Sequence, residues 1–236
     1  MDTGTVFTGS DIDIEGDRRV GARVYPASGP DPLRATLVLG HGAGAGQQSG
    51  FMTSFATSLS ARGIDVVTFN FLYMEARRRV PDANALLETT WRRVIAAVGQ
   101  RPGIENNRLF VGGKSMGGRI ASQVAADPDV RAVVDGLVLL GYPLHPPGQP
   151  ERRRDAHLGN IARPMLFVQG EHDTFGNATE MRALAAGLPA AELYVVSGAN
   201  HSLATPKRAG TSQETVFAAV QDHIVDWMRQ VLAGRR

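Results

Sequence analysis

Ser115 is the residue whose surroundings most clearly indicate covalent chemistry. It stands in the pattern Gly113-x-Ser115-x-Gly117, directly after the apolar run 109–111. This spacing is typical of a nucleophile elbow, a sharp strand-to-helix turn that lifts a serine clear of a sheet. The glycines are expected where the turn approaches neighbouring backbone too closely for a side chain. The pattern alone also fits a glycine-rich turn with an incidental serine, so the partners of Ser115 must decide between the two interpretations.

A serine nucleophile needs a histidine as general base and an acid that orients the histidine. Asp173 and His201 each follow an apolar segment, and both come after Ser115 in the chain. This order predicts that Ser115 attacks, that His201 takes and returns the proton, and that Asp173 orients the imidazole and stabilises the imidazolium. Glu171 is the alternative acid, and His41 is expected to brace its own loop.

Attack on a carbonyl also requires N–H groups that bind the developing oxyanion. We expect the backbone N–H of Met116, the residue after the serine, to be one donor. The second donor is expected from the loop after the strand 36–40, with Ala43 as the first choice and Gly44 as the second. The glycines of this loop could also suggest a phosphate cradle, but the loop lacks the Lys-Ser/Thr ending of a P-loop.

Alternating strand and helix patterns are expected to position these residues. Apolar segments without polar alternation predict strands buried on both faces, at 36–40, 65–71, 109–111, 137–141, 165–168 and 193–196. Helical spacing predicts helices from 51 to about 63, over 87–98, after Ser115, and after the capping patterns Asn177-x-x-Glu180 and Thr211-x-x-Glu214. Segments 5–14 and 19–25 predict a hairpin. The fold class is therefore α/β, with a mostly parallel central sheet, helices on both faces and an N-terminal antiparallel hairpin.

The chain resembles the α/β-hydrolase superfamily through its serine motif and the order Ser115, Asp173, His201. It is most similar to the small, lidless branch related to dienelactone hydrolases, and segments 69–75 and 141–148 resemble a subgroup of largely unassigned specificity. The resemblance implies a single α/β-hydrolase domain over residues 1–236. It also implies a serine hydrolase that cleaves a small ester through an acyl-enzyme intermediate. Dienelactone hydrolases use a cysteine nucleophile, so their particular reaction is not implied.

Basic runs at 77–79, 152–154 and 207–208 follow the expected ends of strands or His201. They could make the mouth of the site basic, which would favour an anionic ester as substrate. The alternative is that flanking acids neutralise them, namely Glu75, Asp82, Glu151 and Asp155. The side chains expected to contact substrate are Tyr73, Arg77, Arg78, Tyr142 and Arg152. The connection 142–164 is too short for a multi-helix cap, so we expect an open site without a large lid.

Composition argues against several other classes of function. The chain has no cysteine, and its histidines lack metal-ligand spacing, so neither a metal nor another cofactor is expected. A net charge of +2 and the acids beside the arginine runs argue against a nucleic-acid partner. No apolar run approaches a membrane span and residues 1–5 lack signal-peptide features, so we expect no membrane partner and a cytoplasmic location. The second functional hypothesis is a hydrolase-fold protein that binds or scaffolds without turnover, which an intact triad disfavours.

Overall fold

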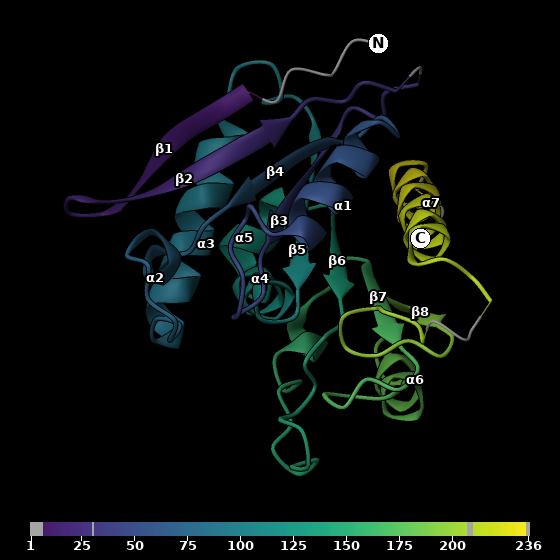
Figure 1. Cartoon of the computed structure of the whole chain (residues 1–236). Helices are drawn as coiled ribbons and strands as arrows, with labels where there is room; N and C mark the ends of the chain where they lie inside the picture. Colours follow the sequence, from purple (N-terminus) through teal and green to yellow (C-terminus); the bar gives the residue numbers. More distant parts are fainter. Residues whose placement is uncertain (1–6, 30, 207–209, 235–236) are drawn as a thin grey trace.

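An eight-stranded sheet forms the centre of the structure, a computed structural model that describes residues 7–29, 31–206 and 210–234 (Figure 1). The strands lie in the order β1-β2-β4-β3-β5-β6-β7-β8. The pairs β1–β2 and β2–β4 are antiparallel, whereas all other neighbours are parallel. The strands are β1 (Phe7–Glu15), β2 (Arg18–Tyr25), β3 (Ala35–Gly40), β4 (Asp65–Phe69), β5 (Arg108–Lys114), β6 (Gly136–Leu140), β7 (Met165–Gly170) and β8 (Ala191–Val196). The predicted fold class is therefore confirmed.

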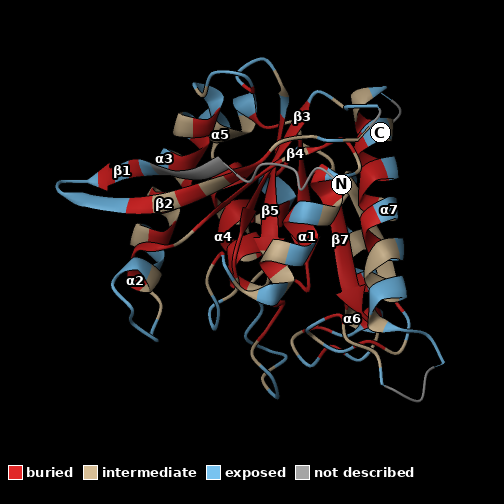
Figure 2. Cartoon of the chain, turned by 45° about the horizontal axis from the view of Figure 1, so that its top comes forward, coloured by how far each residue is buried: buried red, intermediate tan, exposed pale blue. Residues whose placement is uncertain are grey.

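Helices cover both faces of this sheet and bury its apolar strands. They are α1 (Gly50–Ser60), α2 (Leu72–Glu75), α3 (Asn84–Gly99), α4 (Met116–Ala125), α5 (Pro128–Val133), α6 (Ala178–Ala186) and α7 (Gln213–Leu232). The core on one face contains Phe55 of α1 and Trp227 of α7. The core on the other face contains Trp91 of α3, Ile120 of α4 and Met181 of α6. Figure 2 shows the central strands buried, while the helices expose their outer sides.

Side-chain caps begin four of the helices, namely α1, α5, α6 and α7. The predicted capping box of Asn177 and Glu180 is present at the start of α6. At α7 the predicted cap is wrong by one residue, because Ser212 rather than Thr211 accepts the N–H of Thr215. The short helices α2 and α5 were not predicted, since neither is long enough to show a periodic apolar face.

The connection between β6 and β7 contains one short 3₁₀ turn, η1 (Leu158–Asn160), and no α-helix. In Figure 1 it is the green segment that extends away from the sheet below β6. Its composition fits this form, because five prolines between residues 142 and 164 disfavour a regular helix. No helix in the described part of the chain is long and apolar enough to cross a bilayer.

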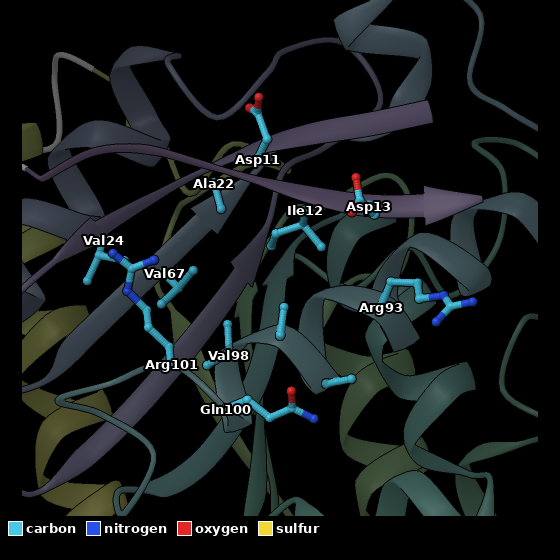
Figure 3. A pocket seen from close by; sticks show the side chains of 12 residues that line it. Asp11, Ile12, Asp13, Ala22, Val24, Val67, Arg93, Val98, Gln100 and Arg101 are labelled. Carbon is cyan, nitrogen blue, oxygen red and sulfur yellow. The ribbon is translucent and has the colours of Figure 1, made fainter. Parts of the chain in front are cut away.

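A hollow of about 350 Å³ lies between the hairpin and α3 (Figure 3). Ile12 and Val98 give it apolar walls, and Asp11 and Arg93 add charged groups. None of the three predicted catalytic residues lines this hollow. These three residues follow β5, β7 and β8 and so lie at the carboxyl ends of the parallel strands. Ligands of open α/β sheets bind at this edge.

Candidate active site

Ser115 occupies a strained turn between β5 and α4. Its backbone has φ 50° and ψ −115°, a conformation that residues other than glycine rarely adopt. Its N–H donates to the carbonyl of Leu140 at the end of β6, with an N···O distance of 2.9 Å, which ties the turn to the sheet. Because α4 begins at Met116, unpaired N–H groups of its first turn lie next to the serine. This is the geometry that a nucleophile elbow requires.

Both glycines of the motif lie against the backbone of β3. A Cβ atom at Gly113 would lie 2.1 Å from the carbonyl oxygen of Gly40, and one at Gly117 would lie 2.2 Å from the same oxygen. Neither contact can be relieved by moving a side chain, because the obstacle is backbone. The close approach predicted from the sequence is confirmed at both positions.

The three predicted catalytic side chains form one continuous chain of hydrogen bonds. Ser115 Oγ lies 2.9 Å from Nε2 of His201, and Nδ1 of His201 lies 2.8 Å from Oδ2 of Asp173. A neutral imidazole therefore donates Nδ1–H to the acid and accepts the serine hydroxyl at Nε2. The Asp173 side chain is fully buried, whereas that of His201 is 23% exposed. The structure brings the three residues together, and their catalytic roles stay predictions.

Two further residues hold the acid and the histidine in place. Gln169 Nε2 donates to Oδ2 of Asp173 at 2.8 Å, and the N–H of Phe175 donates to Oδ1 at 2.8 Å. The Phe175 ring also lies against the His201 ring, with centroids 4.2 Å apart. Sequence reasoning missed both residues. The available signal was an amide side chain within the apolar strand β7, because a buried polar group needs partners.

Glu171, the alternative acid, faces a different part of the chain. Its Oε2 accepts the N–H of Gly198 at 2.7 Å and the hydroxyl of Ser197 at 2.9 Å. These two hydrogen bonds hold the pKa of Glu171 below its usual value. Geometry therefore favours Asp173 as the partner of His201, and Glu171 stabilises the turn that follows β8.

The predicted oxyanion loop (residues 41–46) is held in place by buried aromatic and imidazole groups. The N–H of Phe71 donates to Nε2 of His41 at 3.1 Å, and Nδ1 of His41 donates to the carbonyl of Gly42 at 2.8 Å. Burial lowers the pKa of His41, which keeps this imidazole neutral in the bracing role expected of it. Tyr73 donates its hydroxyl to the carbonyl of Ala43 at 3.0 Å.

This loop lies beside the nucleophile. A Cβ atom at Gly42 would be 3.8 Å from the Cβ of Ser115. The predicted second oxyanion donors, Ala43 and Gly44, follow immediately in the chain and are exposed. This placement suits backbone N–H groups that, together with the N–H of Met116, would bind the oxyanion formed when Ser115 attacks a carbonyl. That role stays a prediction.

Two of the predicted substrate contacts need correction. Tyr73 and Tyr142 are 0% and 1% exposed, so neither side chain can touch a substrate in this conformation. Tyr142 donates its hydroxyl to the carbonyl of Arg154 at 2.7 Å, and so stabilises the β6–β7 connection. Burial raises the pKa of Tyr142 as well as that of Tyr73, the latter to about 12. Both tyrosines position backbone segments of the protein itself.

The predicted arginine contacts are exposed, and several already have partners. Arg78 forms an ion pair with Asp82, and Arg152 donates to Oε1 of Gln149 at 2.7 Å. Arg77 is also exposed. In the same run as Arg152, Arg153 pairs with Asp155 through Nε at 2.9 Å. The third basic run, 207–208, lies outside the described residues. The positive field expected from these runs is therefore partly neutralised by the flanking acids.

Comparison with known proteins adds a family match to this geometry. A family model described as an alpha/beta hydrolase domain matches residues 33–229. A putative phosphoribosyl transferase of Mycobacterium tuberculosis is 28% identical over 211 residues, covering 87% of this chain and 43% of the relative. The chain thus spans less than half the length of the curated relatives that it matches.

Several solved structures share the fold at low sequence identity. Est1E from Butyrivibrio proteoclasticus has a TM-score of 0.75 at 14% identity, covering 96% of this chain and 100% of that one. A dienelactone hydrolase from Anabaena variabilis has a TM-score of 0.72 at 16% identity, with 94% and 96% covered. An α/β serine hydrolase without lid from Xanthomonas campestris has a TM-score of 0.66 at 18% identity, with 93% and 94% covered. At these levels of sequence identity, the similarities show a shared fold alone.

Proposed function

The chain belongs to the alpha/beta hydrolase domain family, and from that premise we propose that it is a serine hydrolase that cleaves a small carboxylic ester. One observation carries the proposal. Ser115, on a strained elbow, is joined through His201 to a buried Asp173 by hydrogen bonds of 2.9 and 2.8 Å. Such a chain activates a serine hydroxyl for attack on a carbonyl carbon.

The proposed reaction uses these groups in two stages. Ser115 Oγ attacks the ester carbonyl while Nε2 of His201 takes its proton, and Asp173 stabilises the imidazolium. The oxyanion is bound by the N–H of Met116 and that of Ala43, with Gly44 as the alternative donor. Collapse of the tetrahedral intermediate breaks the C–O bond, and His201 protonates the departing alcohol.

The second stage releases the acid. Water attacks the acyl-Ser115 ester and gives its proton to His201 Nε2. Collapse of the second tetrahedral intermediate then frees the carboxylic acid, and the proton on His201 returns to Ser115. Each oxyanion donor contributes about 10²–10³ in rate in enzymes of this kind.

A fluorophosphonate probe and a series of p-nitrophenyl esters of increasing acyl length would test the proposal. We expect the probe to label the wild-type protein at Ser115, and we expect turnover to fall with acyl length. Ser115→Ala should be neither labelled nor active. A folded wild-type protein that is neither labelled nor active would support the alternative of a silent binding or scaffold protein.

We further propose that the preferred ester is neutral. The carboxylates of Asp82 and Asp155 pair with Arg78 and Arg153, which reduces the positive field available to a substrate. The test compares kcat/KM for a matched neutral and carboxylate-bearing ester across a salt series. A preference for the charged ester at low salt that disappears as salt rises would instead favour the anionic substrate.

A further inference from the structure

Lys114 is a buried cation inside the serine motif, and its residue type is unusual in this chain. The sequence has 25 lysines and arginines, of which only Lys114 and Lys207 are lysine. Arginine keeps its charge in almost any protein environment, whereas a buried lysine can lose its proton. A lysine directly before the nucleophile therefore places a group that can titrate at the centre of the site.

Three segments of the site meet at the Lys114 side chain. Its Nζ donates to the backbone carbonyl of His201, with an N···O distance of 2.6 Å. Its Cγ would be 3.8 Å from a Cβ atom at Gly42, in the oxyanion loop. A Cβ atom at Gly141, just after β6, would lie 2.7 Å from Nζ and 2.9 Å from the His201 carbonyl oxygen. Gly141, at φ 60°, thus leaves room for this hydrogen bond.

The charge of Lys114 is costly where it lies. Among the described residues, Lys114 has no carboxylate partner within 4 Å, and its ammonium is hydrogen-bonded instead to the neutral carbonyl of His201. Burial lowers the pKa of Lys114 to about 8, and the charge of nearby Asp173 opposes this shift. A buried charge without a paired carboxylate reduces stability, so a role for that charge in the site would explain its presence.

We propose that the Lys114 ammonium is a positioning group that holds the His201 backbone, and thereby keeps the imidazole aligned with Ser115. The role rests on the proposed function, and Lys114 itself does not touch the reacting atoms. A charge-assisted hydrogen bond is stronger than a neutral one. The segment that carries His201 is therefore held most firmly while Lys114 is protonated.

The proposal has a direct consequence for the pH dependence. Asp173, after β7, is the charged group that acts on Lys114, and the segments that contact Lys114 also carry His201, after β8, and His41, next to Gly42. As the pH rises through about 8, Lys114 loses its proton and the hydrogen bond to His201 weakens. We expect kcat to fall over that range while KM changes little, because alignment rather than substrate binding is lost.

Selective ¹³C labelling of lysine gives a direct measurement on the unmodified protein. Only two lysine Cε signals are expected, and Lys207→Arg assigns them. We expect the Lys114 signal to titrate near pH 8, with the same midpoint as the decline in kcat. A Lys114 midpoint at the ordinary value of about 10.4, or one that does not match the decline in kcat, would overturn the proposal.

Lys114→Met, which keeps much of the length and removes the charge, tests the role in a second way. We expect a kcat lower by roughly 10- to 100-fold at pH 7, as for a misaligned catalytic group, and no decline near pH 8. Its melting temperature at pH 7 should change little, because the lost hydrogen bond to His201 is offset by the removal of a buried charge. Arg19→Met removes an exposed cation of the hairpin and should leave the wild-type profile unchanged.

The possible failures can be told apart. If the fluorophosphonate probe labels wild-type Ser115 and Lys114→Met keeps both full kcat and the decline near pH 8, this inference alone is wrong. A variant that loses activity only in proportion to lost folded protein would also overturn it. A wild-type protein that the probe does not label overturns the proposed function and this role with it. The lysine titration needs no variant at Lys114, so it still tests the proposed role of Lys114 if Lys114→Met does not fold.

Discussion

At the scale of single residues, two hydrogen bonds join Ser115, His201 and Asp173, and the proposed reactivity of Ser115 depends on them. Oγ lies 2.9 Å from His201, and the imidazole lies 2.8 Å from Asp173. We expect Ser115→Ala and His201→Ala each to lower kcat by about 10⁴–10⁶, because the members of such a triad act as a unit. Steady-state kinetics on purified variants checks this. Near wild-type turnover in either variant would end the triad assignment.

Gln169 provides a second test at this scale. Its Nε2 donates to Oδ2 of Asp173, so Gln169→Leu leaves a buried carboxylate with one donor fewer. The loss of a hydrogen bond to a charged group costs about 1.5–3 kcal/mol, and if that loss falls on the transition state kcat drops by roughly 10- to 150-fold. Gln221→Leu, at a buried glutamine of α7, is the matched control and should leave kcat unchanged. Equal kinetics in the two variants would show that Gln169 does not support the acid.

At the scale of elements, the packing of α4 and β5 against β3 sets the shape of the elbow. A Cβ atom at Gly117 would lie 2.2 Å from the carbonyl oxygen of Gly40. We expect Gly117→Ala to destabilise the protein by about 1–3 kcal/mol, and to reduce kcat because the backbone must shift beside Ser115. Urea unfolding and kinetics measure the two effects.

Gly99, at the end of α3, supplies the control for Gly117. A Cβ atom there meets nothing within 4 Å. Gly99→Ala should therefore change stability by no more than about 0.5 kcal/mol. If Gly117→Ala behaves like Gly99→Ala, the close approach does not constrain the elbow.

The sequence predicted those parts of the molecule whose signals are local. Apolar strands, the Gly113-x-Ser115-x-Gly117 spacing and the order of Ser115, Asp173 and His201 predict the fold and the meeting of these three side chains at one edge of the sheet. Contacts between distant segments have no such signal. The partner of Lys114 is a carbonyl 87 residues away, and the donor to Asp173 lies within a buried strand. The two tyrosines were misplaced because their types suggest a binding site, whereas packing decides their burial.

At the scale of the whole molecule, the connection between β6 and β7, which is described throughout, contributes no α-helical cap to the site. The β6–β7 connection carries only a single 3₁₀ turn. We therefore expect ordinary saturation kinetics on dissolved esters and no increase in rate when a substrate forms an emulsion. Activity on a short-chain ester measured below and above its solubility limit checks this. A sharp rise at the limit would mean that part of the chain moves to uncover the site.

The β6–β7 connection also divides the predicted catalytic residues between two parts of the polypeptide. The β6–β7 connection is exposed near Pro150 and Glu151, and this point separates the predicted site residues into two groups along the chain. The chain before that point carries Ser115 and the loop 41–46, and the chain after it carries Asp173 and His201, which are the proposed acid and base. Two separately produced fragments that meet at this point would each be inert. Ester turnover would then be a readout of their reassociation, as in a split-enzyme reporter.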